Sequence, residues 1–200
     1  LPIWCPMREM LSMIVVLTVL TAVSGGLLAA VEQTTRPQIE EQVLKFQKAP
    51  AIKEIFTDIS NDPIQERVDV TVDGTTLQVF PAVLSDGKKA VAFEAKGTGF
   101  GGPVGLMVGI NLGTDEIIAV RVTTHSETPG IGSRAKEDLS FVSQFAGKSM
   151  SANFSLKKGG GDIDAMSGAT VTSAGVSQAA LAAQALYKKL KPEIVKQIAN

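Results

Sequence analysis

One segment near the N-terminus limits what this chain can fold into more than any other. Residues 10–31 contain no charged side chain and are mostly Leu, Val, Ile, Met and Ala. As an α-helix this segment would extend about 33 Å, against about 30 Å for the hydrocarbon core of a bilayer. A secretory signal peptide has a shorter apolar region, of about 7–15 residues, and the sequence around Ala29 and Ala30 matches its A-x-A-like cleavage pattern poorly. The segment therefore predicts a retained transmembrane helix.

The next segment, 32–63, is polar and charged, and it predicts two short stalk helices. The first begins at Pro37, because proline favours the first helical turn, and Pro50 interrupts it. The apolar residues at helical spacing in it are Ile39, Val43 and Phe46. The second helix is expected over 52–59.

Charge and ligand counts exclude several classes of function. The chain has 19 Lys and Arg against 20 Asp and Glu, a net charge of −1, so no nucleic-acid role is expected. Its single cysteine, Cys5, cannot form an internal disulfide. With one cysteine and one histidine, zinc sites of the CxxC type and iron–sulfur sites cannot be built, and no metal site is expected.

After the stalk, the apolar pattern changes to a period of two. Apolar and polar residues alternate over 68–72 and again over 77–79. An Asp-Gly pair at 73–74 lies between these two runs and indicates a hairpin, and a second pair at 86–87 precedes a strand over 90–94. Two adjacent hairpins predict an antiparallel sheet.

The segment 97–102 reads GTGFGG and matches the GxGxxG pattern of dinucleotide-binding turns. That fingerprint requires a helix to follow, whereas Pro103 leads here into an apolar, strand-like segment at 104–110. We therefore expect a glycine-lined loop between two strands, with Phe100 and Met107 packed in the core.

Another strand, 117–122, and two helices complete the expected fold. Ser133 is placed to cap a helix that stops at Gly147, and the last helix runs over 172–190. The apolar residues expected on their buried sides are Leu139, Val142, Phe145, Val176, Ala179, Ala180, Ala183, Leu186 and Leu190. The predicted class is α+β: a single N-terminal transmembrane helix, then a domain over 64–200 with a mainly antiparallel sheet and packed helices.

Two loops can carry chemistry, 125–132 and 159–170. The second contains a glycine run, two acids and a cluster of small residues that ends in Thr170, directly before the last helix. Small residues let a bulky ligand approach the backbone, and a helix N-terminus offers free N–H groups to a phosphate. This pattern alone favours the interpretation of Ser167 and Thr170 as ordinary loop and cap residues.

These loops also carry a family resemblance. Residues 164–170, DAMSGAT, are similar to the DxxSGAT sequence of FMN-binding domains in which FMN is joined by a phosphoester bond to the final threonine, here Thr170. Residues 125–132, HSETPGIG, resemble the companion ETPGxG loop. The order of elements is similar to that of the G subunits of Rnf-type ion-translocating complexes, which link ferredoxin and NAD. The related C subunits of sodium-translocating NADH:quinone reductases, an alternative assignment, are usually longer.

The resemblance implies a set of cofactor-binding residues around the covalent anchor Thr170. Ser167, Gly168 and Ala169 would shape the turn and supply backbone donors near the phosphate, with Thr172 as an additional hydroxyl donor. Asp164 would serve recognition by the flavin transferase. In the other loop, Glu127 and Thr128 would contact the ribityl chain or the ring, and Pro129, Gly130 and Ile131 would form the turn and its apolar face. No catalytic acid, base or nucleophile is expected, because the flavin carries the redox chemistry.

The resemblance further implies an electron-transfer subunit of a membrane ion-translocating ferredoxin:NAD oxidoreductase. Its partners would be the other membrane subunits of that complex and, during maturation, a flavin transferase that uses FAD and magnesium. Arg8 and Arg36 flank the membrane segment, so charge does not fix the orientation. The family implies that residues 1–9 are cytoplasmic and that the flavin domain lies on the periplasmic side of the inner membrane.

Two other classes of function fit parts of the sequence. A membrane-tethered adaptor without catalysis would share every predicted element and differ only in leaving Thr170 unmodified. A serine hydrolase would use the SxxK pattern at 155–158, but its SDN and KTG partner motifs are absent from the sequence.

Overall fold

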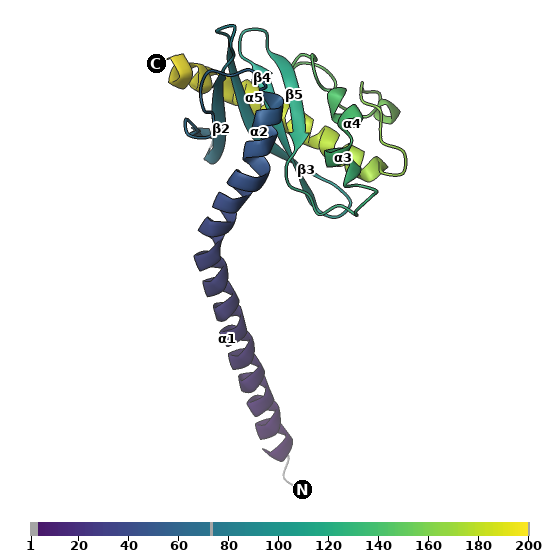
Figure 1. Cartoon of the computed structure of the whole chain (residues 1–200). Helices are drawn as coiled ribbons and strands as arrows, with labels where there is room; N and C mark the ends of the chain where they lie inside the picture. The colour runs from purple at the N-terminus through teal and green to yellow at the C-terminus, as the bar shows by residue number, and fades with distance from the viewer. Residues whose placement is uncertain (1–3, 73, 200) are drawn as a thin grey trace. The chain divides into compact units, whose positions relative to one another are not determined.

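The computed structural model describes residues 4–72 and 74–199, which divide into two units, Leu1–Leu44 and Lys45–Asn200. In the first unit, α1 (Trp4–Val43) is one uninterrupted helix (Figure 1). The helical run Met7–Ile55 contains a stretch that is apolar and long enough to cross a membrane by length and composition. This agrees with the transmembrane helix predicted over 10–31.

The prediction that a new helix begins at Pro37 is wrong, because α1 continues through this residue. Proline removes one N–H donor from the helix, and on an exposed helix the carbonyl left unpaired can bond to water. The regular α-helix gives way only at Leu44–Lys48, a π-helical segment (η1) that is followed directly by α2 (Ala49–Ile55). The second stalk helix therefore begins before residue 52 and ends before residue 59, since Phe56 is extended.

In the second unit, five antiparallel strands form one sheet in the order of the sequence. They are β1 (Val68–Val72), β2 (Thr75–Val83), β3 (Lys89–Thr98), β4 (Pro103–Asn111) and β5 (Glu116–Val122). Val72 pairs with Thr75 across the first predicted hairpin, of which Asp73 lies outside the described residues. The second turn is closed by the Gly87 N–H, which donates to the Leu84 carbonyl at 2.8 Å. The predicted antiparallel sheet is confirmed.

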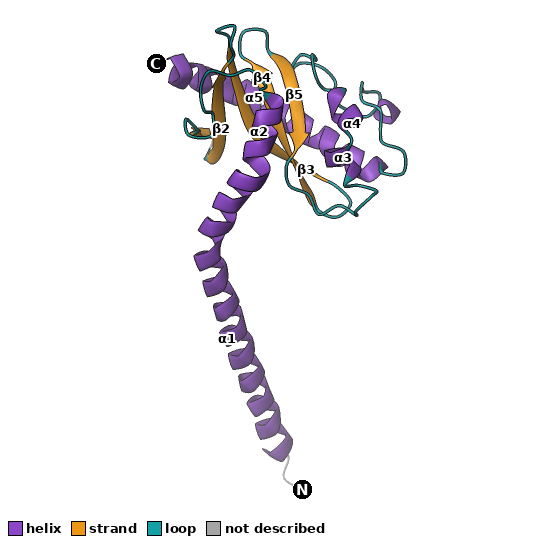
Figure 2. Cartoon of the chain, viewed as in Figure 1, coloured by secondary structure: helices purple, strands orange, loops and turns teal. Residues whose placement is uncertain are grey.

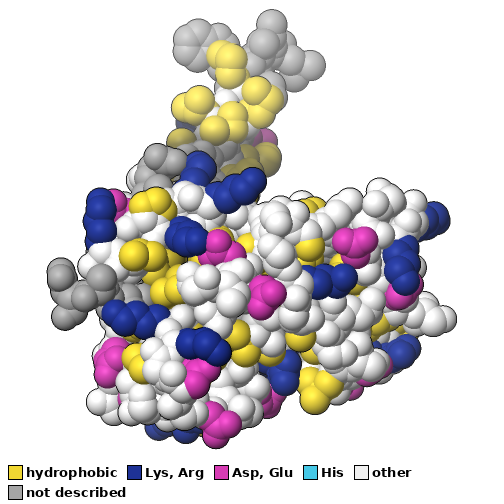
Figure 3. All heavy atoms as spheres, turned by 90° about the horizontal axis from the view of Figure 1, so that it is seen from above, with side chains coloured by type: hydrophobic (Ala, Val, Ile, Leu, Met, Phe, Trp, Pro, Cys, Tyr) yellow, Lys and Arg dark blue, Asp and Glu magenta, His cyan; other side chains and the backbone are white. Residues whose placement is uncertain are grey.

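The sheet lies between helices on its two faces (Figure 2). On one face α5 (Thr170–Ala199) packs along β3 and β4, and on the other α2 packs on β4 and β5. The predicted apolar stripe of the last helix is buried from Val176 to Leu190 except at Leu186, which is half-buried. That helix begins two residues before the predicted start, and it continues past Pro192 to Ala199. On the face that Figure 3 shows, basic and acidic side chains are interspersed.

The single helix predicted after Ser133 is in fact two short ones, α3 (Arg134–Glu137) and α4 (Leu139–Ser143). Asp138 separates them, because its backbone is extended and its side chain caps α4 by accepting from the Ser140 N–H at 2.9 Å. The Ser133 side chain makes no cap bond. Val142 and Phe145 are buried as predicted, but Leu139, in the first turn of α4, is exposed.

Candidate functional site

Three segments that are distant in sequence meet at the N-terminal turns of α5. They are the β3–β4 loop at 99–102, the loop 123–133 and the turn 166–169. The buried carboxylate of Glu127 links the first two segments to α5, and the backbone of Gly99 lies directly against Gly175 of the helix. We call this assembly the three-loop site.

The turn before α5 is held by one buried side chain. The Ala169 N–H donates to the Met166 carbonyl at 3.1 Å, and Gly168 sits at the φ of +78° that such a turn requires of its third residue. The hydroxyl of Ser173 accepts from the Met166 N–H and donates to the Ala169 carbonyl, both at 2.9 Å. Ser173, which is fully buried, was missed from the sequence. Its place on the buried stripe of the helix, three residues before Val176, is the signal that could have found it.

Thr170 is the first residue of α5, and its side chain is exposed. Ser167 and Gly168 are also exposed, whereas Ala169 is buried beneath the turn. The first N–H groups of a helix have no partner within it, and they carry partial positive charge. The structure therefore presents an exposed threonine at the N-terminus of a long helix, where an attached phosphate would be stabilised.

Glu127 lies inside the site, with only 6% of its surface exposed. One carboxylate oxygen accepts from the Gly101 N–H at 2.9 Å, and the other accepts from the hydroxyl of Thr172, a residue that is 2% exposed. These two predicted site residues are thus brought together as buried partners. Neither side chain lies on the exposed surface with Thr170.

The remaining residues of the ETPG loop form a tight exposed turn. The Thr128 carbonyl accepts from the N–H groups of Ile131, Gly132 and Ser133 at 3.0–3.2 Å. Gly130 has a φ of +73°, and its N–H donates to the Ser133 hydroxyl at 2.8 Å. Ser133 has a helical backbone, with φ −57° and ψ −22°, instead of the extended one of an N-cap, and this accounts for the missing cap bond to α3. The exposed side chains of this turn are Thr128, Pro129 and Ile131.

The glycines of the GxGxxG segment allow close backbone approach. A Cβ at Gly97 would lie 2.0 Å from the carbonyl oxygen of Gly175, and one at Gly101 would lie 2.0 Å from that of Ser126. The loop between strands is confirmed, and Met107 is buried as predicted. Phe100 is not in the core, contrary to the prediction, because the backbone on both sides of it is drawn inward and leaves its side chain 75% exposed.

Charged groups surround the turn before α5. Arg134 donates to the Ser167 carbonyl at 3.3 Å, and Lys157 pairs with Asp164 at 2.6 Å. Gln144 fixes the backbone of Asp164, since its amide oxygen accepts from the Asp164 N–H at 2.8 Å.

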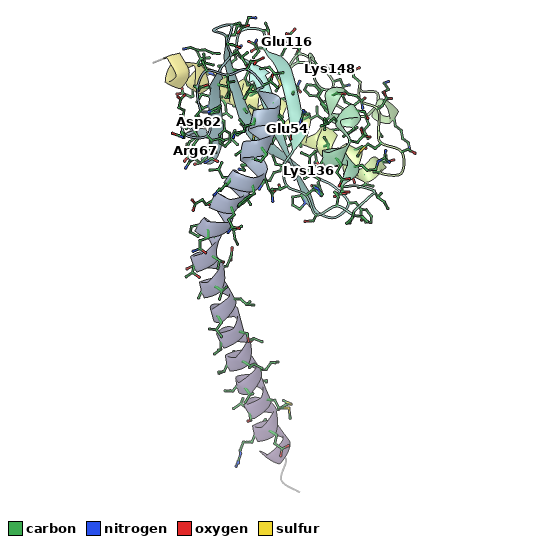
Figure 4. The ribbon with its side chains drawn as sticks, viewed as in Figure 1. Glu54, Asp62, Arg67, Glu116, Lys136 and Lys148 are labelled. Carbon is green, nitrogen blue, oxygen red and sulfur yellow. The ribbon has the colours of Figure 1, made fainter. Side chains whose placement is uncertain are left out.

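Lys136, labelled in Figure 4, donates to the Thr123 carbonyl at 3.0 Å and secures the start of the ETPG loop. Within residues 4–72 and 74–199, no group of three or more His, Cys, Asp or Glu side chains forms a potential metal site.

Comparison with known proteins identifies relatives of most of the chain. Residues 99–185 match the model of the FMN-binding domain family. The chain is 36% identical over 168 residues to the G subunit of the ion-translocating oxidoreductase complex of Salmonella typhi, covering 79% of this chain and 81% of that protein. Over 195 residues it is 33% identical to the G subunit of the same complex in Escherichia coli (strain K12), covering 92% and 93%.

A solved structure shares the fold. The crystal structure of the C subunit of the Na⁺-translocating NADH-quinone reductase from Parabacteroides distasonis superimposes with a TM-score of 0.51, at 23% sequence identity. The match covers 66% of this chain and 78% of the other.

Proposed function

This chain belongs to the family of ion-translocating oxidoreductase complex G subunits, and we propose that FMN is joined to its Thr170 by a phosphoester bond. The chain is an electron-transfer subunit of a membrane complex, and FMN is its cofactor. The observation that carries the attachment is the exposure of Thr170 at the first position of α5. A modifying enzyme can reach this residue, and the helix N-terminus would stabilise the phosphate charge.

The surroundings of Thr170 fit an attached flavin. Three exposed apolar side chains belong to the three-loop site and the first turn of α5: Phe100, Ile131 and Val171. They offer apolar surface to the isoalloxazine ring of FMN. When it is bound, this flavin would supply the electron-transfer chemistry. The guanidinium of Arg134 lies beside the turn and adds positive charge near the phosphate.

A covalent bond suits a domain that faces a dilute compartment. FMN held by a reversible site would be lost wherever its free concentration is far below its dissociation constant. A covalent link removes this loss, and it lets the ring stay exposed for electron exchange with a partner. We place the domain on the periplasmic side of the inner membrane, with residues 1–9 in the cytoplasm and a flavin transferase as the maturation partner.

The rest of the chain anchors the flavin domain. We assign residues 10–31 to the membrane span, 32–63 to the stalk, whose last helix packs on the sheet, and 64–200 to the FMN-binding domain. The span has no ionisable residue with which to conduct an ion, so we assign ion movement, and hence the translocase activity, to other subunits.

Intact mass and flavin fluorescence test the attachment. The full chain is produced with a flavin transferase, then denatured and washed free of unbound flavin. The wild type and the control Ser126→Ala, which removes another exposed hydroxyl of the three-loop site, should be fluorescent and heavier by one FMN unit. Thr170→Ala should show no flavin fluorescence and should have the mass of the unmodified chain. A fluorescent Thr170→Ala protein would contradict the attachment of FMN to Thr170. A wild-type protein without FMN would favour the alternative of a membrane-tethered adaptor.

A further inference from the structure

The Glu127 carboxylate joins two loops of the three-loop site to α5. It belongs to the ETPG loop, accepts from the Gly101 N–H of the β3–β4 loop, and accepts from Thr172 in the first turn of α5. Both oxygens are used in these bonds, and the residue is 6% exposed. A buried carboxylate in this position therefore holds together three parts of the chain that are far apart in sequence.

Glycines enclose this carboxylate closely. A Cβ at Gly99 would lie 2.4 Å from one carboxylate oxygen, and a Cβ at Gly132 would lie 2.6 Å from the other. The neighbouring chain therefore packs directly on the acid, and both of its oxygens already accept hydrogen bonds from the protein. These bonds favour a structural role for Glu127 over the direct contact with the ribityl chain or the ring expected from the sequence.

Residues next to the bonded groups carry the exposed apolar surface. Phe100 precedes Gly101, and Val171 precedes Thr172. Ile131 precedes Gly132, which packs against the carboxylate. The α5 helix fixes Val171 next to Thr170. The positions of Phe100 and Ile131 relative to Thr170 therefore depend on the bonds and the packing of Glu127.

We infer that Glu127 is a positioning residue, which fixes the orientation of the attached flavin by holding both loops on α5 without touching the cofactor. This inference rests on the attachment of FMN to Thr170. Loss of the carboxylate would release the loops while leaving Thr170 exposed and modifiable. The flavin would then be attached but no longer held in one orientation.

The test compares Glu127→Ala with Glu127→Gln, using Glu137→Ala as a control because Glu137 is an exposed acid on α3. A glutamine can accept from Gly101 and donate to the Thr172 hydroxyl, so it keeps both bonds. In Glu127→Ala the mass should still show one FMN, but quenching of flavin fluorescence by a soluble quencher should rise several-fold. Glu127→Gln and Glu137→Ala should behave as the wild type.

Thr172→Val gives a second route in case the alanine variant does not fold. It removes the donor from the same bond, and it should raise both the quenching and the hydrogen exchange of the Gly101 amide, the latter by about tenfold. Thr172→Ser keeps a hydroxyl and should restore the wild-type values. In the double variant that combines Thr172→Val with Glu127→Ala, quenching should be no higher than in Glu127→Ala alone, because both substitutions break the same hydrogen bond.

The outcomes separate the two proposals. A wild-type protein without FMN by mass would overturn the attachment, and this inference with it. Variants that carry FMN but show wild-type quenching and amide exchange would overturn the role of Glu127 alone. Additive effects of the two substitutions would also contradict it.

Discussion

The two motif loops of this protein place similar residues in opposite environments. The ETPG loop (125–132) buries its acid, since Glu127 is 6% exposed. The SGAT loop, residues 159–170, exposes the acid of its motif, since the Asp164 side chain is 62% exposed. The threonines at the start of α5 differ in the same way: Thr170 is exposed and Thr172 is buried. One loop is therefore built to hold the site together, and the other to present a group to the outside.

Helical spacing explains the difference between the two threonines. Thr172 lies one turn before Val176 and two turns before Ala179, on the stripe that packs against the sheet. Thr170 shares its side of the helix with Ala174 and Gln178, which are exposed. A residue type alone does not decide its role here, because burial decides which groups its hydroxyl can reach.

The largest effect should come from the glycines of the two loops. Gly132→Ala would place a Cβ within 2.8 Å of both Glu127 and Thr172, and it should lower the free energy of unfolding by about 3 kcal/mol. Gly168→Ala meets no atom within 4 Å and should cost only about 1 kcal/mol, from its φ of +78°. Urea unfolding of the two apoproteins measures both values. Equal losses of unfolding free energy in Gly132→Ala and Gly168→Ala would show that the two loops are packed alike.

The two threonines sharpen the comparison. Thr172→Val leaves a buried carboxylate oxygen without its donor, and it should lower the free energy of unfolding of the apoprotein by about 2 kcal/mol. Thr170→Val changes an exposed residue and should alter it by less than about 0.5 kcal/mol. Denaturant unfolding without transferase measures both. A stability loss in Thr170→Val would mean that its hydroxyl supports the fold.

A third acid, Asp115, provides an intermediate case at the other end of α5. It accepts from Lys191 and Tyr187, and the bond from Lys191, followed by that from Tyr187, holds the pKa of Asp115 below its ordinary value of 3.8. The bonds therefore stabilise the fold above pH 3.8, and this contribution is lost as the pH falls from there through the lowered pKa. The side chains of Lys191 and Asp115 are 39% and 41% exposed, so screening limits the effect to less than about 1 kcal/mol.

The Asp115→Asn variant tests this contribution. Its stability should fall less steeply than that of the wild type over the acid range, measured by urea unfolding at a series of pH values. Parallel curves for the two proteins would contradict a stabilising role for the ionised Asp115.

The smallest effect is expected at Asp164. Its pair with Lys157 is exposed on both sides, so Asp164→Asn should change the free energy of unfolding by less than about 0.5 kcal/mol. If the same variant accepts much less FMN from the transferase, the acid serves recognition and not folding. Lys157→Gln is the matched control, since it breaks the same pair and should leave FMN loading unchanged. A destabilised Asp164→Asn protein would remove the contrast between the two acids.

Local patterns in the sequence were enough to predict the main elements. The uncharged segment 10–31, the period of two in the strands and the Asp-Gly turns depend on neighbours within a few residues, and each was found where expected. Segment ends were less well predicted. Pro37 did not start a helix, and Asp138 divided one predicted helix into two, because solvent and capping bonds compensated the backbone at those positions.

By itself, the sequence determined the long apolar N-terminal helix, the antiparallel sheet and the two motif loops, since these follow from composition and short-range spacing. Only the tertiary structure decided that Glu127 and Thr172 bond to each other, that Ser173 holds the turn before Thr170, and that Phe100 lies outside the core. Those outcomes depend on backbone segments up to tens of residues apart approaching within a few ångströms, through the glycines that permit contact with α5. Local periodicity carries no information about such distances.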